Sequence, residues 1–145
     1  MHQNFSDFQT KFKTQEFNIY QSDHWVWSLR PVHSTLGAGV LSLKRYCEKM
    51  SDMTLAESED LGRITKIIEA SLMKSFSYDR INYLMLMMVD PHLHFHVFPR
   101  YNSERFFGDI GFVDSGWPKL PELTAPSVET TVLHEIKDLI IKNIS

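Results

Sequence analysis

The spacing of apolar residues predicts three helices. Residues 5–12 carry three phenylalanines at near-helical intervals, which predicts a short amphipathic helix that packs these rings on the body of the protein. A longer helix is expected after Thr54, because Thr54 and Glu57 have the spacing of a capping box. A closing helix is predicted over about 127–143. The long helix should lie on a sheet through an apolar stripe made of Leu61, Ile64, Ile67, Ile68, Leu72 and Phe76.

Short segments rich in apolar and β-branched residues predict the strands. Such segments occupy residues 17–20, 24–30 and 40–44, and in the last of them apolar and polar positions alternate. The segment 83–89 (YLMLMMV) is apolar on both faces, which is typical of an interior strand. We therefore interpret its methionines, at positions 85, 87 and 88, as part of the core. Residues 106–113 are expected to form a further strand or an extended loop.

The order of these elements indicates an α+β fold with an antiparallel sheet, because most strands follow one another directly. Residues 114–126 contain three prolines and should be irregular. The chain shows no internal repeat and no linker long enough to divide it. We expect one domain over residues 1–145, with a core of about 15–113 and the closing helix packed on it.

Composition and charge narrow the range of partners. With 145 residues, 43% of them hydrophobic, the chain can bury its own core. Its 18 acidic and 15 basic residues give a net charge of −3, which does not favour binding to nucleic acid but leaves a phosphorylated ligand open. The single cysteine, Cys47, fits a reducing compartment. The polar N-terminus and the lack of a long apolar run predict a cytoplasmic protein without a membrane partner.

The segment 92–97 (HLHFHV) carries the chemistry, because histidines alternate with apolar residues. On a β-strand, His92, His94 and His96 would share one face and the three apolar residues would share the other. A core strand has no need of three polar rings on one face. Imidazole can attack, donate a proton or bind a metal near neutral pH. The pattern therefore predicts a reaction site or a ligand site.

The pattern has three interpretations. The histidines could be buried polar residues satisfied by the backbone, although desolvating three unpaired imidazoles would be costly. Two of them could bind a metal with a distant third ligand such as His24 or His33, although three consecutive positions on one strand fit a tetrahedral shell awkwardly. Nucleophilic catalysis is the third interpretation, since a neutral imidazole attacks phosphorus readily and needs no cofactor or metal.

The histidine segment resembles the signature of the histidine triad superfamily of nucleotide hydrolases and transferases. The longer segment 89–101 (VDPHLHFHVFPRY) is similar to a bacterial branch described as diadenosine tetraphosphate hydrolase-like. The resemblance extends over about residues 20–101 and includes 35–45 (TLGAGVLSLKR) and 79–83 (DRINY). It implies an α+β fold with about five antiparallel strands and a long helix packed on them, commonly as a homodimer.

The same resemblance implies a reaction. Nucleoside phosphate conjugates, such as dinucleoside polyphosphates, would be cleaved at the α-phosphorus through a nucleotidyl-histidine intermediate. His94 would be the nucleophile, with a main-chain carbonyl holding the proton on its far nitrogen. His96 would contact the phosphate or the leaving group, and His92 would support the arrangement of the rings.

Two departures from the superfamily pattern put the ligand in doubt. Many members carry Asn or Gln shortly before the triad, where this chain has Met88. Asn82 is the nearest amide, but it lies too far along the strand to replace it. Members also often bind ribose with Asp or Asn on an early strand, where this chain has residues 27–30 (WSLR). A nucleotide-binding protein without useful turnover therefore stays open as an alternative.

Three residues are candidates for nucleotide binding. Ser28 and Arg30 stand where a ribose-binding acid would be expected, and the Arg30 guanidinium could instead meet a phosphate. Arg100 shares the face of the triad histidines by alternation, so it is a candidate phosphate contact. The two tryptophans of residues 24–30 are interpreted as core residues.

Overall fold

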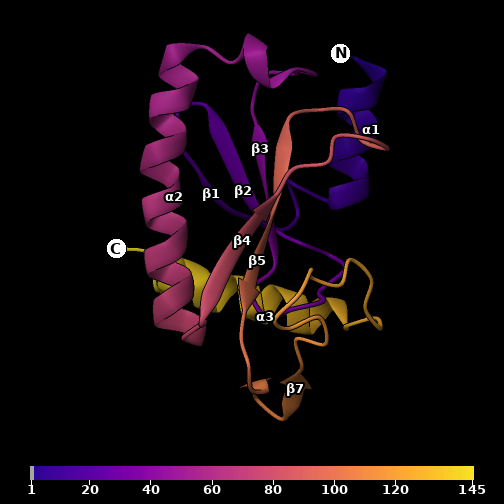
Figure 1. Ribbon diagram of the computed structural model, residues 1–145, viewed down its shortest axis with the longest axis vertical. Helices are drawn as coiled ribbons and strands as arrows, with labels where there is room; N and C mark the ends of the chain where they lie inside the picture. Colours follow the sequence, from indigo (N-terminus) through magenta and orange to yellow (C-terminus); the bar gives the residue numbers. More distant parts are fainter. Residues whose placement is uncertain (1) are drawn as a thin grey trace.

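A five-stranded antiparallel sheet lies between helices in the computed structural model, which describes residues 2–145 (Figure 1). The strand order is β1-β2-β3-β5-β4, and every neighbouring pair is antiparallel. The predicted α+β fold with about five antiparallel strands is confirmed. The elements are α1 (Gln3–Phe12), β1 (Asn18–Gln21), β2 (Trp25–Leu29), β3 (Gly39–Leu43), a 3-10 turn η1 (Met50–Asp52), α2 (Leu55–Phe76), β4 (Arg80–Leu84), β5 (His94–Arg100), β6 (Arg105–Phe107), β7 (Ile110–Phe112) and α3 (Thr130–Lys142).

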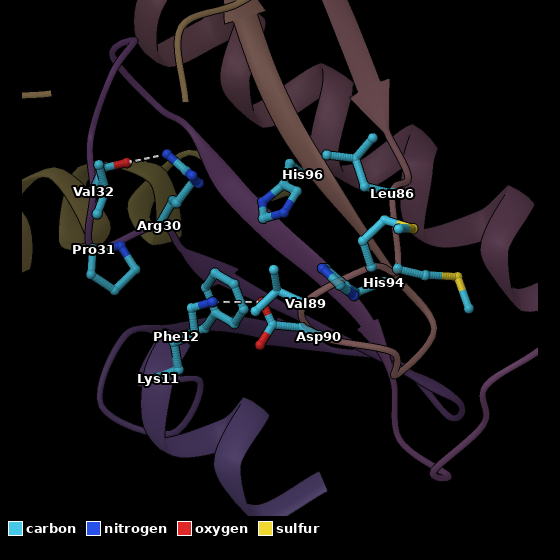
Figure 2. A pocket seen from close by; sticks show the side chains of 12 residues that line it. Lys11, Phe12, Arg30, Pro31, Val32, Leu86, Val89, Asp90, His94 and His96 are labelled. Carbon is cyan, nitrogen blue, oxygen red and sulfur yellow. Dashed lines mark hydrogen bonds and ion pairs between the residues drawn. The ribbon is translucent and has the colours of Figure 1, made fainter. Parts of the chain in front are cut away.

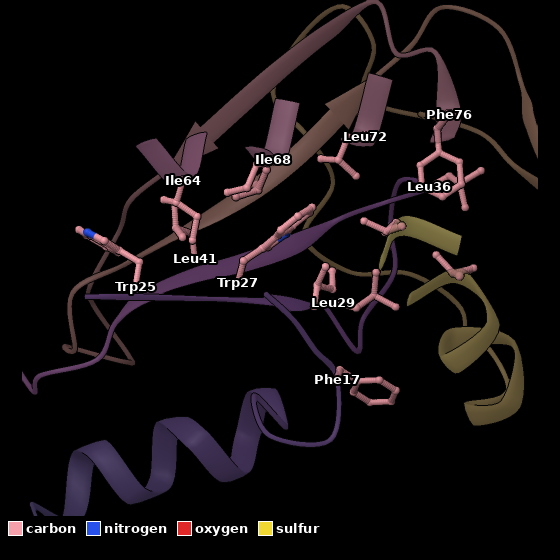
Figure 3. Packing of buried hydrophobic residues seen from close by; sticks show 14 of the residues in the cluster. Phe17, Trp25, Trp27, Leu29, Leu36, Leu41, Ile64, Ile68, Leu72 and Phe76 are labelled. Carbon is pink, nitrogen blue, oxygen red and sulfur yellow. The ribbon is translucent and has the colours of Figure 1, made fainter. Parts of the chain in front are cut away.

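Helix α2 begins at the predicted capping box. The Thr54 hydroxyl accepts a hydrogen bond from the Glu57 backbone N–H, and the Glu57 carboxylate accepts one from the Thr54 N–H. The apolar stripe of α2 then packs against one face of the sheet, where the tryptophans of β2 are fully buried (Figure 3). Residues of α3 join the same cluster. The prediction that the apolar stripe of the long helix lies on the sheet is therefore confirmed, and both tryptophans are core residues as expected.

Helix α1 lies on the opposite side of the sheet from α2 (Figure 1). Of its ten residues only Phe8 and Phe12 are buried, and they form a small cluster with Val40 of β3. This face of the sheet also carries His94 and His96, which pair in register with Ser42 and Val40. The prediction that the N-terminal phenylalanines pack on the body is confirmed.

The prediction of an interior strand over 83–89 is wrong. Strand β4 ends at Leu84 and lies at an edge of the sheet, paired only with β5. Residues 85–89 leave the sheet, and Met87 has a φ of 54°. Met88 is 82% exposed and is not a core residue, whereas Met85 and Met87 pack partly against the core. An apolar run does not distinguish burial in the core from exposure at the rim of a cavity.

The histidine strand begins two residues later than the pattern predicts. Strand β5 starts at His94, so His92 lies in the connection just before it. The connection after β5 forms the hairpin of β6 and β7, and residues 114–126 contain no helix or strand, as expected. Helix α3 falls within the range predicted for the closing helix. No helix within residues 2–145 has the length and apolarity required to span a bilayer.

Candidate active site

His92 is a buried side chain with a fixed tautomer. Its Nδ1 lies 3.3 Å from the Cys47 backbone N–H, which can only donate, so Nδ1 accepts. Its Nε2 therefore carries the proton and donates to the Leu43 carbonyl at 2.8 Å. Burial lowers the pKa of His92 to about 4, so the ring is neutral at pH 7. With both nitrogens occupied by the backbone, His92 can position its neighbours but cannot attack a ligand.

His94 presents one nitrogen that is free to react. Its Nδ1 donates to the backbone carbonyl of His92 at 2.5 Å, which leaves the lone pair on Nε2. The residue is 2% exposed, and burial is the main cause that lowers its pKa. A neutral imidazole held in this tautomer is a nucleophile or a base. The main-chain carbonyl contact implied by the superfamily resemblance is present.

His96 is the third neutral ring. Burial is the main cause that lowers its pKa, to about 3, and the positive charge of Arg30 adds to the effect. Its Nδ1 is buried and has no hydrogen-bond partner among residues 2–145. Its ring lies edge-on to that of His94, with 5.0 Å between the ring centroids. An unpartnered imidazole nitrogen costs free energy unless a ligand or solvent satisfies it.

His94 and His96 line a cavity of about 250 Å³ (Figure 2). Besides the two histidines, its walls come from three segments: Lys11 and Phe12 of α1, residues 30–32 after β2, and residues 86–90 between β4 and β5. Lys11 Nζ and Asp90 Oδ2 form an ion pair at 2.7 Å. The cavity therefore brings together residues far apart in the sequence around two neutral imidazoles.

Arg30 gives the cavity a positive charge. Its guanidinium donates to the Val32 carbonyl at 2.8 Å and lies over the Phe98 ring, 5.4 Å from the centroid. Its Nε is buried and unpartnered among residues 2–145. Arginine donors suit phosphate oxygens, so Arg30 is placed to meet an anion beside the histidines.

Phenylalanines of α1 cover the triad. The Phe8 ring centroid lies 4.8 Å from that of His94 and 5.1 Å from that of His92. The Phe12 centroid lies 5.6 Å from that of His96. These rings explain the low exposure of the histidines. Their helical spacing indicated a packed face but not the partner of that face.

The structure separates the three predicted nucleotide-binding residues. Arg30 lines the cavity, whereas Ser28 and Arg100 do not. Ser28 is fully buried, with its hydroxyl 3.5 Å from the Val40 carbonyl. Arg100 is held by Asp114 through two hydrogen bonds, of 2.6 and 3.1 Å, and by Asn82 Oδ1 at 2.7 Å. Its guanidinium is therefore occupied within the fold.

Several cavity residues were missed in the sequence. Lys11 and Asp90 carry no spacing signal, because their ion pair joins positions 79 residues apart. Met88 stands where many superfamily members have an amide, and the structure places it in the cavity wall and not inside a strand. The exposed run of apolar residues after β4 could have been found only by recognising that the strand ends early.

The donors proposed for a metal do not converge. The Nε2 of His33 accepts from the Gly37 N–H at 3.0 Å, and its Nδ1 donates to the Arg30 carbonyl at 3.1 Å. Burial lowers the pKa of His33 to about 4. Within residues 2–145, no group of three or more histidine, cysteine or acidic side chains could hold a metal ion.

Comparison with solved structures identifies the fold. The chain is similar to a histidine triad protein from Sinorhizobium meliloti, with a TM-score of 0.69 and 18% identity, over 91% of this chain and 93% of that one. The chain has the histidine triad fold. A histidine triad protein from Marinobacter aquaeolei gives a TM-score of 0.67 at 16% identity, over 92% and 95% of the two chains.

A hypothetical histidine triad nucleotide-binding protein from Sulfolobus tokodaii is a third neighbour. It gives a TM-score of 0.66 at 14% identity, over 88% of this chain and 82% of that one. No family model and no curated protein matches the sequence. The comparisons establish the histidine triad fold, and the activity has to be argued from the site.

Proposed function

We propose that the protein is a nucleotidyl hydrolase or transferase of the histidine triad superfamily. It would cleave nucleoside phosphate conjugates at the α-phosphorus through a covalent bond to His94. The observation that carries this proposal is the hydrogen bond from His94 Nδ1 to the His92 carbonyl, which leaves the Nε2 lone pair available beside the cavity. The histidine triad fold and the positive charge of Arg30 support the same assignment.

The proposed reaction has two steps. His94 Nε2 attacks the phosphorus atom, and the bond from phosphorus to the leaving group breaks, so the leaving group takes the electron pair and gains a proton. Water or another acceptor then attacks the phosphorus and loses a proton, and the bond from phosphorus to Nε2 breaks, which releases the nucleotide and restores neutral His94. Two moderate barriers replace one high barrier.

His96 and Arg30 would act on the charge of the phosphate. Arg30 would bind a phosphate oxygen through its guanidinium. Burial keeps His96 neutral at pH 7, but an anionic phosphate beside it would raise its pKa and favour a proton on the ring. His96 could then donate to a phosphate oxygen or to the leaving group. His92 would act only by holding His94.

The proposal is tested by measuring release of nucleoside monophosphate from dinucleoside polyphosphates and from adenylated and guanylated amines. His94→Ala should lower turnover by roughly 10³-fold or more, as loss of a nucleophile does. His134→Ala, which removes a partly exposed histidine on α3, should retain wild-type turnover. A strong chelator should leave the activity unchanged. Wild-type turnover in the His94→Ala variant would contradict the proposal.

Nucleotide binding without turnover is a second candidate, and the cover of Phe8 over His94 favours it. It predicts saturable binding by calorimetry and no product after prolonged incubation. A burst of product in the wild-type protein would exclude it.

A cytoplasmic homodimer is part of the same proposal. Strands β1 and β4 each have one neighbour in the sheet, so each leaves an edge that can pair with a second copy. Sedimentation equilibrium should give twice the 17.0 kDa mass of one chain. A single-chain mass at micromolar concentration would count against the dimer.

A further inference from the structure

Consecutive apolar side chains form one wall of the cavity. Leu86, Met87, Met88 and Val89, in the connection between β4 and β5, all line it. Leu86 is 50% exposed, Met88 82% and Val89 85%. Neighbouring apolar side chains that remain open to solvent around a cavity are typical of a binding surface.

The connection that carries these side chains has an unusual backbone conformation and is tied to α1. Met87 has a φ of 54°, a left-handed conformation that residues other than glycine rarely adopt. Asp90, at the other end, is tied to α1 by its ion pair with Lys11. Figure 2 shows Leu86 on one side of His96, with Arg30 and Val32 on the other. The apolar wall therefore faces one flank of the point where a phosphate would meet His96 and Arg30.

The charges of the cavity match one phosphate. Lys11 and Asp90 neutralise each other, and the two lining histidines are neutral at pH 7 because burial lowers their pKa. Arg30 is then the one unbalanced charge among the lining residues. One positive charge complements a single phosphodiester or phosphoramidate anion. A polyphosphate chain, with a charge on each phosphate, would leave several charges without a partner.

Apart from the two histidines, the lining residues also lack neutral polar side chains. None of them carries a hydroxyl or an amide. A sugar or another polar leaving group that lies against residues 86–89 would lose hydrating water without gaining a hydrogen bond to a hydroxyl or amide side chain. An apolar group would bury surface against Leu86, Met88 and Val89 and would gain free energy in doing so.

We propose that the substrate of the proposed reaction joins one nucleotide phosphate to an apolar leaving group, which residues 86–89 hold. This inference rests on the proposed function and narrows its substrate class. For an amine conjugate, the P–N bond breaks as the bond from His94 Nε2 to phosphorus forms, and the amine leaves with a proton that His96 donates. Water then attacks the phosphorus and passes a proton back to His96 as the bond from Nε2 to phosphorus breaks, so the conjugate and one water give the nucleoside monophosphate and the free amine.

The test compares two leaving groups of equal length. The probes are adenosine and guanosine 5′-phosphoramidates of hexylamine and of 2-(2-aminoethoxy)ethanol, and the readout is kcat/KM for release of the monophosphate. The wild-type enzyme should prefer the hexyl conjugate by about tenfold, the effect expected for burying a few methylene groups. Met88→Gln should reduce that preference by about fivefold, since it replaces the exposed thioether by an amide of similar size.

Two further variants complete the comparison. Val89→Thr, a change of nearly equal volume at an exposed position, should reduce the preference in the same direction. Met73→Gln places the same amide on the exposed side of α2, away from the cavity, and should leave the preference unchanged. Comparing ratios between variants cancels the difference in basicity between the two amines.

The outcomes separate this inference from the proposed function. Equal kcat/KM values for the two conjugates would overturn the proposal of an apolar leaving group. A preference that neither Met88→Gln nor Val89→Thr alters would overturn it as well. Faster cleavage of a dinucleoside tetraphosphate than of the hexyl conjugate would overturn it too, while leaving the proposed function intact. If none of these conjugates releases monophosphate, the proposed function and the inference are both overturned.

Discussion

The three triad histidines differ in what their nitrogens can do. His92 has both ring nitrogens occupied by backbone groups, whereas His94 has only Nδ1 occupied. The Nδ1 of His96 is unpartnered among residues 2–145. One sequence pattern thus yields a support, a candidate nucleophile and a candidate donor. The backbone contacts, and not the residue type, divide these roles.

Burial predicts the pH dependence of the proposed activity. Protonation of Nε2 would remove the lone pair of His94, and burial lowers its pKa below the ordinary 6.5. The acid limb of kcat/KM should therefore have its midpoint below pH 6.5. Circular dichroism over the same range controls for unfolding. An acid limb with its midpoint at or above 6.5 would show that His94 is not shielded as described.

At the residue scale, the sequence predicts which side chains share a face of the strand, but it does not predict their hydrogen-bond partners. Alternation placed His94, His96 and Arg100 on one face correctly. It could not show that Asp114 and Asn82 occupy the Arg100 guanidinium, because that network depends on how the segment after β7 folds back. Nor could it assign tautomers, which depend on backbone carbonyls.

Among the elements, α1 covers the site that β5 carries. Its two buried phenylalanines pack on the triad, and Lys11 joins it to the β4–β5 connection. Because Lys11 and Phe12 line the cavity, the position of α1 determines part of its shape. Accessibility of His94 should therefore depend on α1.

Removing the Phe8 ring tests this cover. Phe8→Ala should cost about 3–5 kcal/mol of unfolding free energy, as for other buried phenylalanines. It should also speed the acylation of His94 by diethyl pyrocarbonate, followed by mass spectrometry of the peptide. Phe106→Ala, at a 63% exposed position, should change neither quantity. An unchanged acylation rate in a folded Phe8→Ala protein would show that α1 does not shield His94.

The sequence predicted the helices better than the edge of the sheet. The capping box at Thr54 and Glu57 is local, so it predicts the start of α2 without any knowledge of tertiary contacts. The end of β4 is not local. Residues 85–89 are as apolar as a buried strand, so the sequence does not mark the residue at which the chain leaves the sheet to line the cavity.

Across the whole molecule, one buried ion pair ties the irregular segment to the sheet. Asp114 accepts two hydrogen bonds from the Arg100 guanidinium and one from the Tyr101 N–H. The side chains of Arg100 and Asp114 are 4% and 1% exposed. A charge left alone at such a position is poorly solvated, so the pair helps fix the path of residues 114–126.

Removing one side chain of the Arg100–Asp114 ion pair should lower the stability of the fold. Asp114→Ala should lower the unfolding free energy by about 3–5 kcal/mol, because it leaves the Arg100 charge buried without its carboxylate. Urea denaturation measures the change. Asp109→Ala, in the exposed β6–β7 turn, should stay within about 0.5 kcal/mol of the wild type. A similarly small effect at Asp114 would mean that the pair contributes little to the fold.

The central claim is that His94 carries the nucleotide during turnover. The most direct test mixes the wild-type protein with a cleavable nucleotide conjugate, quenches the reaction rapidly in alkali and maps the modified peptide by mass spectrometry. The account predicts a nucleoside monophosphate bound to His94, formed before free monophosphate accumulates and absent from the His94→Ala variant. Product formed without this adduct, or an adduct on another residue, would contradict it.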